Sequence, residues 1–182
     1  TAAAAKEATG ARVIHMEVGQ PSTSAPVTAR DAVKRAIDSN ALGYTLALGL
    51  PELRQNIASL YKDWYGLDLS PERVVVTSGS SAAFVLTFLA LFDVGATVAL
   101  PSPGYPCYRN ILSALGQRTK IVETGPENRW MPVHEQIDAI AADVQGLLLA
   151  SPANPTGTML EPARLRAIID VCRSRNLWFI SD

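Results

Sequence analysis

The sequence has little charge and no excess of either sign. Charged residues make up 18% of the 182-residue chain, 16 basic side chains stand against 17 acidic ones, and the net charge is −1. A protein that holds nucleic acid through its phosphates needs a basic patch. This composition offers no surplus of lysine or arginine for one, so we expect no nucleic-acid partner.

Cysteines and long apolar runs are also scarce. Cys107 and Cys172 are the two cysteines, and their spacing is not that of metal ligands. They predict a reduced, cytoplasmic protein without a metal site. No run approaches the ~18–20 apolar residues that span a membrane. The opening TAAAAKEATG has no long apolar core, so we expect neither a membrane partner nor a signal peptide.

Apolar residues are plentiful, at 48% of the chain, which is enough for a globular core. Beyond residue 72, short β-rich segments alternate with helical ones. Strands are predicted at 73–77, 96–100, 118–122, 146–150 and 177–181, and helices at 81–92, 105–115, 134–142 and 161–175. Apolar strands separated by helices predict an α/β protein, a three-layer α/β/α fold with a mainly parallel sheet.

The first third of the chain has a different rhythm. Residues 1–25 are predicted to form an irregular arm, followed by helices at 27–40 and 51–66. The helix predicted at 81–92 is apolar nearly all round. Such helices are usually buried, so we expect this one to lie between the sheet and another layer.

Four segments at the ends of predicted strands carry polar or aromatic groups. They are SGSS at 78–81, SPGYP at 102–106, SPANPTG at 151–157, and Asp182. In open parallel sheets, ligands bind outside the carboxyl ends of the strands. All four segments lie at such ends, so we expect them to share one cleft.

Two of these segments suit a phosphorylated, planar ligand. Gly79, Ser80 and Ser81 precede a helix, and the first amides of a helix favour an anion; a plain helix cap is the alternative. Tyr105 can stack on a flat heterocycle, although a half-buried tyrosine in a helix-starting turn gives the same pattern.

The other two segments supply an amide and a carboxylate. Asn154 lies between two prolines that restrict its backbone, and its amide can donate to a phenolate-like oxygen. Asp182 follows an apolar strand, and a buried carboxylate needs a partner such as a protonated ring nitrogen. The alternatives are a structural turn at Asn154 and a strand-end cap at Asp182.

The order of these strings resembles the amino-terminal portion of the class I/II pyridoxal-phosphate-dependent aminotransferases of fold type I. SPANPTG is close to a signature of that family, and the resemblance covers residues 13–182. It also includes EVGQP near the start and Tyr44 ahead of GLPELR. It implies an amino-terminal arm at 1–25 and a partial large cofactor-binding domain at 26–182, without the carboxy-terminal part or the small domain.

The resemblance implies pyridoxal 5′-phosphate as the cofactor and a role for each segment. Gly79, Ser80 and Ser81 would cradle the phosphate. Tyr105 would stack on the ring, and Asn154 would hydrogen-bond the ring oxygen.

Three further residues complete the implied site. Asp182 would pair with the ring nitrogen, which makes the ring an electron sink. Tyr44 would reach the phosphate of the neighbouring subunit in a homodimer, and Gly19 would lie near the substrate carboxylate.

The implied activity is transfer of an amino group between an amino acid and a 2-oxo acid. In the family, the Schiff-base lysine and the arginine that binds the substrate carboxylate lie further along the chain. No catalytic residue is therefore expected here, and the chain itself is predicted to be inactive. Two alternatives share the same motifs: a lyase or synthase on this fold, and the aminotransferase-like domain of a transcription regulator.

Overall fold

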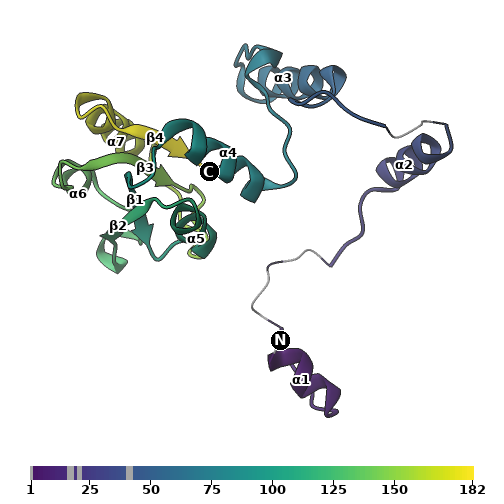
Figure 1. The fold of residues 1–182 in the computed structure, drawn as a ribbon, viewed down its shortest axis with the longest axis horizontal. Coiled ribbons are helices and arrows are strands. Elements are labelled where there is room, and N and C mark those ends of the chain that lie inside the picture. The colour runs from purple at the N-terminus through teal and green to yellow at the C-terminus, as the bar shows by residue number, and fades with distance from the viewer. Residues whose placement is uncertain (1, 16–18, 20–21, 40–42) are drawn as a thin grey trace. The chain divides into compact units, whose positions relative to one another are not determined.

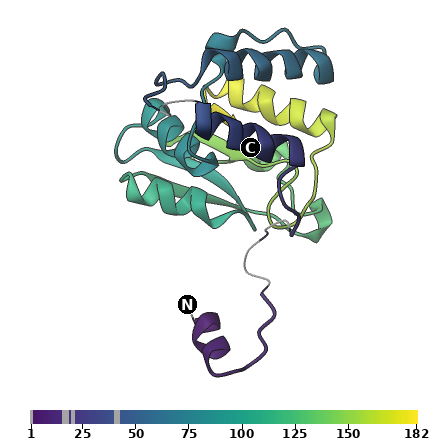
Figure 2. The same ribbon diagram turned by 90° about the vertical axis from the view of Figure 1, so that its right-hand side faces the viewer.

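The computed structural model describes residues 2–15, 19, 22–39 and 43–182, which fall in two units divided after residue 46. The first unit contains the helices α1 (Ala2–Ala8) and α2 (Val27–Ser39). α2 confirms the helix predicted there. The prediction of an irregular arm is wrong at α1, the short purple helix in Figure 2. This segment is rich in alanine, the residue with the highest helix propensity.

The second unit contains the sheet and the remaining helices (Figure 1). Its elements are α3 (Pro51–Tyr65), η1 (Pro71–Arg73), α4 (Ser80–Leu91), β1 (Thr97–Ser102), α5 (Pro106–Ala114), β2 (Arg118–Glu123), η2 (Pro126–Asn128), α6 (His134–Asp138), β3 (Val144–Leu149), α7 (Pro162–Ser174) and β4 (Trp178–Ser181). Four of the five predicted strands are present, and the predicted helices are found within four residues of their expected bounds.

The four strands form one parallel sheet in the order β2-β1-β3-β4. The chain passes outward from β1 to β2 through α5, then returns across β1 to β3 through α6. The direction of progress along the sheet therefore reverses between β1 and β3. In open α/β sheets, this reversal opens a crevice at the carboxyl ends of the two strands.

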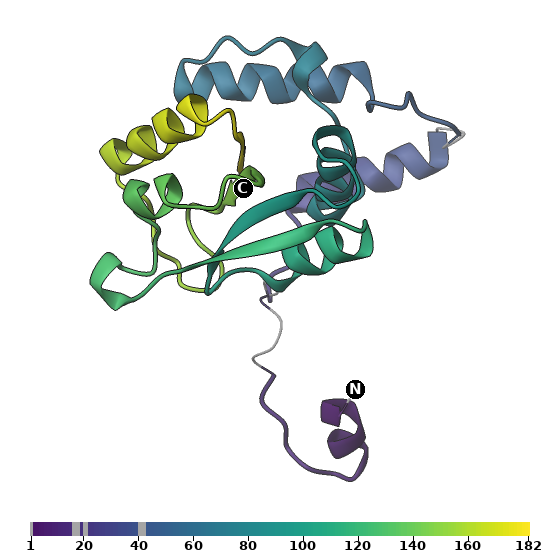
Figure 3. The same ribbon diagram turned by 60° about the vertical axis from the view of Figure 1, so that its left-hand side comes forward.

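Helices cover both faces of the sheet, which confirms the three-layer prediction. Because side chains alternate along a strand, Val98 and Leu100 of β1 pack toward α4 and α5, while Ala99 packs toward α6 and α7. Figures 1 and 3 show the two helix pairs on opposite sides of the strands. All three side chains are buried, so the sheet is the middle of the core.

α4 is covered on one face within this unit. Phe84 and Phe88 are buried, whereas Leu86 and Leu89 are 54% and 58% exposed. The sequence predicted that this helix lies between the sheet and another layer. The contact with the sheet is present, whereas the opposite face of the helix is exposed in this unit. No helix in the described part of the chain is long and apolar enough to cross a membrane.

The strand predicted at 73–77 is wrong. Residues 71–73 form a short 3-10 helix, and the residues after it pair with no strand of the described sheet. The Arg54 side chain takes two of the carbonyls: its Nε donates to the Val74 oxygen at 2.8 Å and its Nη2 to the Pro71 oxygen at 2.9 Å. Valine favours a strand when a neighbouring strand is present to pack and pair with it.

Arg175 provides a test of how α7 is fastened to α6. Its guanidinium donates to the carbonyls of Ile137, Asp138 and Ile140, each at 2.8 Å. Because hydrogen bonds from a charged donor contribute about 1.5–3 kcal/mol each and this group is partly exposed, we expect Arg175→Met to lower the free energy of unfolding by about 2 kcal/mol in urea titrations. Arg173→Met is the matched control, since the Arg173 side chain is 78% exposed. Equal losses in both variants would contradict this role.

Gly146 of β3 tests the packing between the sheet and α4. A Cβ at this position would lie 2.4 Å from Cζ of Phe92, closer than any real contact. Overpacking a core costs about 1–3 kcal/mol, so we expect Gly146→Ala to lower the thermal midpoint by several degrees in calorimetry. Gly43→Ala is the control, because nothing lies within 4 Å of a Cβ there. An unchanged midpoint for Gly146→Ala would argue against this contact.

Candidate functional site

A small, open pocket lies at the carboxyl ends of β1 and β3, where the chain reverses its direction along the sheet. Its walls come from the loop after β1, the loop after β3, and the segment that follows η2. The lining residues include Pro103, Tyr105, Trp130, Met131, Ala153 and Asn154. The structure therefore brings two of the predicted ligand-binding segments into one pocket.

Tyr105 lies at the start of α5. Pro106 begins the helix, and the half-buried Tyr105 ring stands edge-on to the ring of Tyr108, with centroids 5.3 Å apart. Gly104 makes this turn possible, because a Cβ there would lie 2.6 Å from the Pro101 carbonyl oxygen. A hydrogen bond with Cys107 is the main cause that raises the pKa of the Tyr105 phenol.

Asn154 lies in the loop at 151–157. The loop closes on itself through two backbone hydrogen bonds, from the Ala153 amide to the Thr158 carbonyl at 2.8 Å and from the Gly157 amide to the Ala153 carbonyl at 2.7 Å. Both bonds join backbone groups of Ala153, Gly157 and Thr158, so the loop is closed without the side chain of Asn154, which is exposed. The loop thus presents the amide at the pocket wall.

Asp182 is held at three points. Its amide donates to the Leu149 carbonyl at 2.9 Å, and its carbonyl accepts from the Ser151 amide at 3.1 Å. Both bonds continue the pairing of β3 with β4. The Tyr108 hydroxyl donates to Oδ2 of the carboxylate. Burial raises the pKa of the Tyr108 phenol above its ordinary value, and the bond to Asp182 raises it further.

The predicted phosphate segment forms the start of α4. Gly79 has φ of +81°, and Thr77 Oγ1 donates to its carbonyl at 2.9 Å. A Cβ on Gly79 would meet nothing within 4 Å, so the left-handed backbone explains the glycine and the space beside it is open. The amides of the exposed Ser80 and Ser81 precede the first helical hydrogen bond, from Ala83 to Gly79. Such amides are available to an anion.

Tyr108 connects these parts. Its ring contacts Tyr105, its hydroxyl binds Asp182, and Phe84 of α4 lies edge-on to it at 5.0 Å. Tyr108 therefore connects the aromatic face of Tyr105, the Asp182 carboxylate and the helix that begins at Ser80, while the Asn154 amide lies in the pocket wall. These are groups that suit a flat ring with an oxygen, a basic nitrogen and a phosphate.

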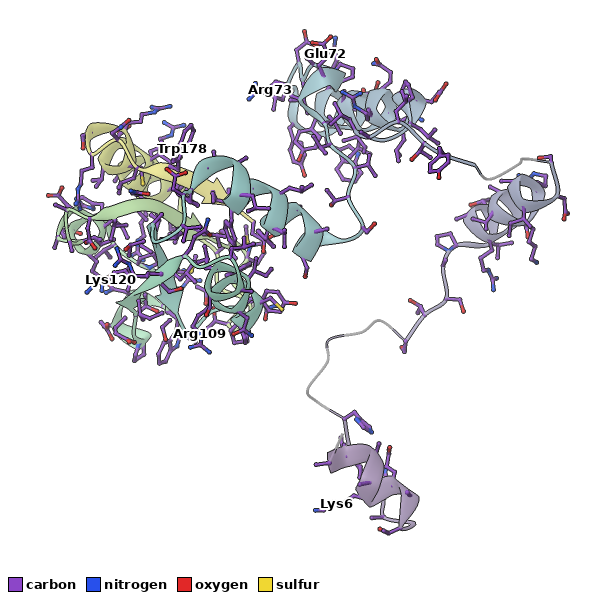
Figure 4. All side chains as sticks on the ribbon, in the orientation of Figure 1. Lys6, Glu72, Arg73, Arg109, Lys120 and Trp178 are labelled. Carbon is purple, nitrogen blue, oxygen red and sulfur yellow. The ribbon has the colours of Figure 1, made fainter. Side chains whose placement is uncertain are left out.

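Gly19 and Tyr44 belong to the first unit, and their contacts with substrate and cofactor remain predictions. Most of the arm motif around Gly19 lies outside the described residues. All four lysines are exposed, and Lys6 and Lys120 extend from the surface in Figure 4.

The sequence interpretation missed Tyr108 and the wall formed by Trp130 and Met131. Tyr108 had a signal, because it follows Tyr105 by three residues at a helix start, and such residues share a face. Trp130 gave none. It adopts φ of +58° in the crossing from β2 to β3, and its place beside Asn154 depends on that crossing.

The chain matches the family model "Aminotransferase class I and II" over residues 11–182. It is 46% identical over 181 residues to the valine–pyruvate aminotransferase of Mycobacterium tuberculosis, covering 100% of this chain and 47% of that protein. It is 29% identical over 171 residues to the aspartate aminotransferase of Pyrococcus horikoshii, covering 93% and 44%.

Solved structures agree. The crystal structure of an aminotransferase from Mycobacterium tuberculosis matches with a TM-score of 0.94 at 46% identity, covering 100% of this chain and 47% of that one. The aspartate aminotransferase of Thermus thermophilus with maleate matches with a TM-score of 0.93 at 28% identity, covering 100% and 48%. The chain thus spans about half the length of the relatives it matches, and it belongs to the class I and II aminotransferase family.

Proposed function

We propose that the chain comprises the amino-terminal arm (1–25) and part of the large cofactor-binding domain (26–182) of an aminotransferase. The parent enzyme moves an amino group between an amino acid and a 2-oxo acid. The observation that carries this proposal is the pocket shared by Tyr105 and Asn154 at the reversal between β1 and β3. Relatives named for valine–pyruvate and for aspartate match the same portion. The proposed substrates are therefore an amino acid and a 2-oxo acid, without a particular side chain.

Tyr105 and Asn154 of this pocket, together with Asp182 after β4, fit the ring of pyridoxal 5′-phosphate, the cofactor of the family. Tyr105 offers an aromatic face, and Asn154 offers an amide that its own loop does not use. Asp182 offers a carboxylate with one oxygen bound to Tyr108, which leaves the other to accept a proton-bearing ring nitrogen.

The start of α4 fits the phosphate. Ser80 and Ser81 add hydroxyls to first-turn amides, and the helix dipole favours negative charge at this end. The open space beside Gly79 gives a phosphate room to approach the backbone.

When bound, the cofactor supplies a ring that withdraws electrons from the α-carbon of the amino acid. Asp182 would keep the proton on the ring nitrogen, since a nearby carboxylate favours the charged form of its partner. Tyr105 would shield one ring face from water. We assign the covalent lysine to a part of the parent enzyme outside this chain, because all four lysines here are exposed.

The remaining roles follow from the resemblance. We propose that the parent enzyme is a cytoplasmic homodimer in which Tyr44 reaches the neighbouring subunit's cofactor phosphate. Gly19 would allow the arm to approach the substrate carboxylate.

Cofactor binding tests the pocket directly. We expect Asn154→Asp to weaken binding of pyridoxal 5′-phosphate about tenfold or more in absorbance titrations. The substitution replaces the amide donor with a negative charge that repels the phenolate-like oxygen of the ring. Asn176→Asp is the matched control, since Asn176 lies in the turn before β4, away from the lining of this pocket. Equal affinity in all three proteins would count against the assigned site.

A second experiment tests the absence of catalysis in this chain. With cofactor and an amino donor, we expect no 2-oxo acid above the free-cofactor background. Borohydride trapping should give no single stoichiometric adduct on Lys6, Lys34, Lys62 or Lys120. Turnover or such an adduct would refute the assignment of the covalent lysine to a part of the parent enzyme outside this chain. In the complete enzyme, stoichiometric 2-oxo acid supports transfer, whereas ammonia or a β-eliminated product would indicate a lyase.

A further inference from the structure

Tyr108 is a buried polar side chain outside the roles assigned above. It is 4% exposed, and its ring packs at 5.0 Å from Phe84 and 5.3 Å from Tyr105. Its hydroxyl donates to Oδ2 of Asp182, which lies 74 residues further along the chain. A buried tyrosine hydroxyl usually finds a partner, and here the partner is the carboxylate that follows β4.

We propose that Tyr108 is a positioning residue whose hydroxyl fixes the Asp182 carboxylate, so that Oδ1 remains available to the ring nitrogen of the cofactor. This inference rests on the proposed function for the identity of the ligand. The anchoring of Asp182 itself is a property of this chain alone.

The hydroxyl, and not the ring alone, is needed for this role. Backbone bonds to Leu149 and Ser151 fix the main chain of Asp182 but leave its exposed side chain free to change rotamer. The bond from Tyr108 selects one rotamer. A carboxylate that must meet a ring nitrogen within hydrogen-bond reach gains from such selection, since misplacement by about 1 Å is costly in an enzyme site.

The ring of Tyr108 extends the effect to the phosphate end. Phe84 follows Ser80 by four residues in α4, so the two lie about one helical turn apart. Phe84 contacts Tyr108, and Tyr108 binds Asp182. One side chain thus links the start of α4, the stacking Tyr105 and the carboxylate.

Tyr108→Phe tests the hydroxyl while keeping the ring. In the wild-type chain we expect the three-bond Hα–Hβ couplings of Asp182 to report a single χ1 rotamer. In Tyr108→Phe they should move to averaged values. Tyr61→Phe, on the exposed side of α3, is the matched control and should leave them unchanged. Unaltered Asp182 couplings in a folded Tyr108→Phe chain would overturn the proposal.

Asp182→Asn tests the same bond from the exposed partner, so it does not depend on the core tolerating Tyr108→Phe. The ionisable groups near Tyr108 are Tyr105, Cys107 and Asp182. With ¹³Cζ-labelled tyrosine, Asp182→Asn should lower the pKa of Tyr108, which burial still holds above the ordinary value of about 10. Asp170→Asn, exposed on α7, should not. An unchanged Tyr108 pKa in Asp182→Asn would contradict the hydrogen bond between the Tyr108 hydroxyl and the Asp182 carboxylate.

A cofactor titration separates this inference from the proposed function. We expect Tyr108→Phe to bind pyridoxal 5′-phosphate about tenfold more weakly than wild type. Wild-type affinity in Tyr108→Phe, alongside weak binding by Asp182→Asn, would overturn the positioning role. Absence of binding by the wild-type chain would instead count against the cofactor site, while averaged Asp182 couplings in Tyr108→Phe would still support the anchoring.

Discussion

The pairing of β1 with β3 is the constraint on which the site depends. Because α5 leads the chain away from β1 on one side and α6 returns it to the other, the loops after these strands diverge and leave space between them. Tyr105 and Asn154 occupy the two walls of that space. The parallel order of the strands places Tyr105 and Asn154 at the same edge of the sheet, before any side-chain contact is considered.

Polar side chains with several bonds then fix the helices that carry these groups. Gln117 donates to the Phe88 and Phe92 carbonyls at the end of α4, at 3.1 and 2.9 Å, and Arg175 closes the end of α6. Buried backbone carbonyls at helix ends need such donors. Neither residue lines the pocket, and both fasten helices of the layers that flank the sheet.

Much of this arrangement is readable from local sequence, and the rest is not. Apolar runs followed by Pro, Gly and Asn marked the loops at 102–106 and 151–157, because turn chemistry is local. The strand predicted at 73–77 failed because pairing requires a neighbour that local sequence does not show. Trp130 was missed for a related reason, since its place at the pocket comes from a crossover between distant strands. α1 was missed although its alanines are a local signal.

The bond between the Ser151 amide and the Asp182 carbonyl has a geometric consequence. It joins Ser151, the first residue of the Asn154 loop, to the backbone that follows β4, at the spacing of two paired strands, about 4.8 Å. The start of this loop and the Asp182 backbone therefore stay at a fixed separation whatever residues lie further along the loop.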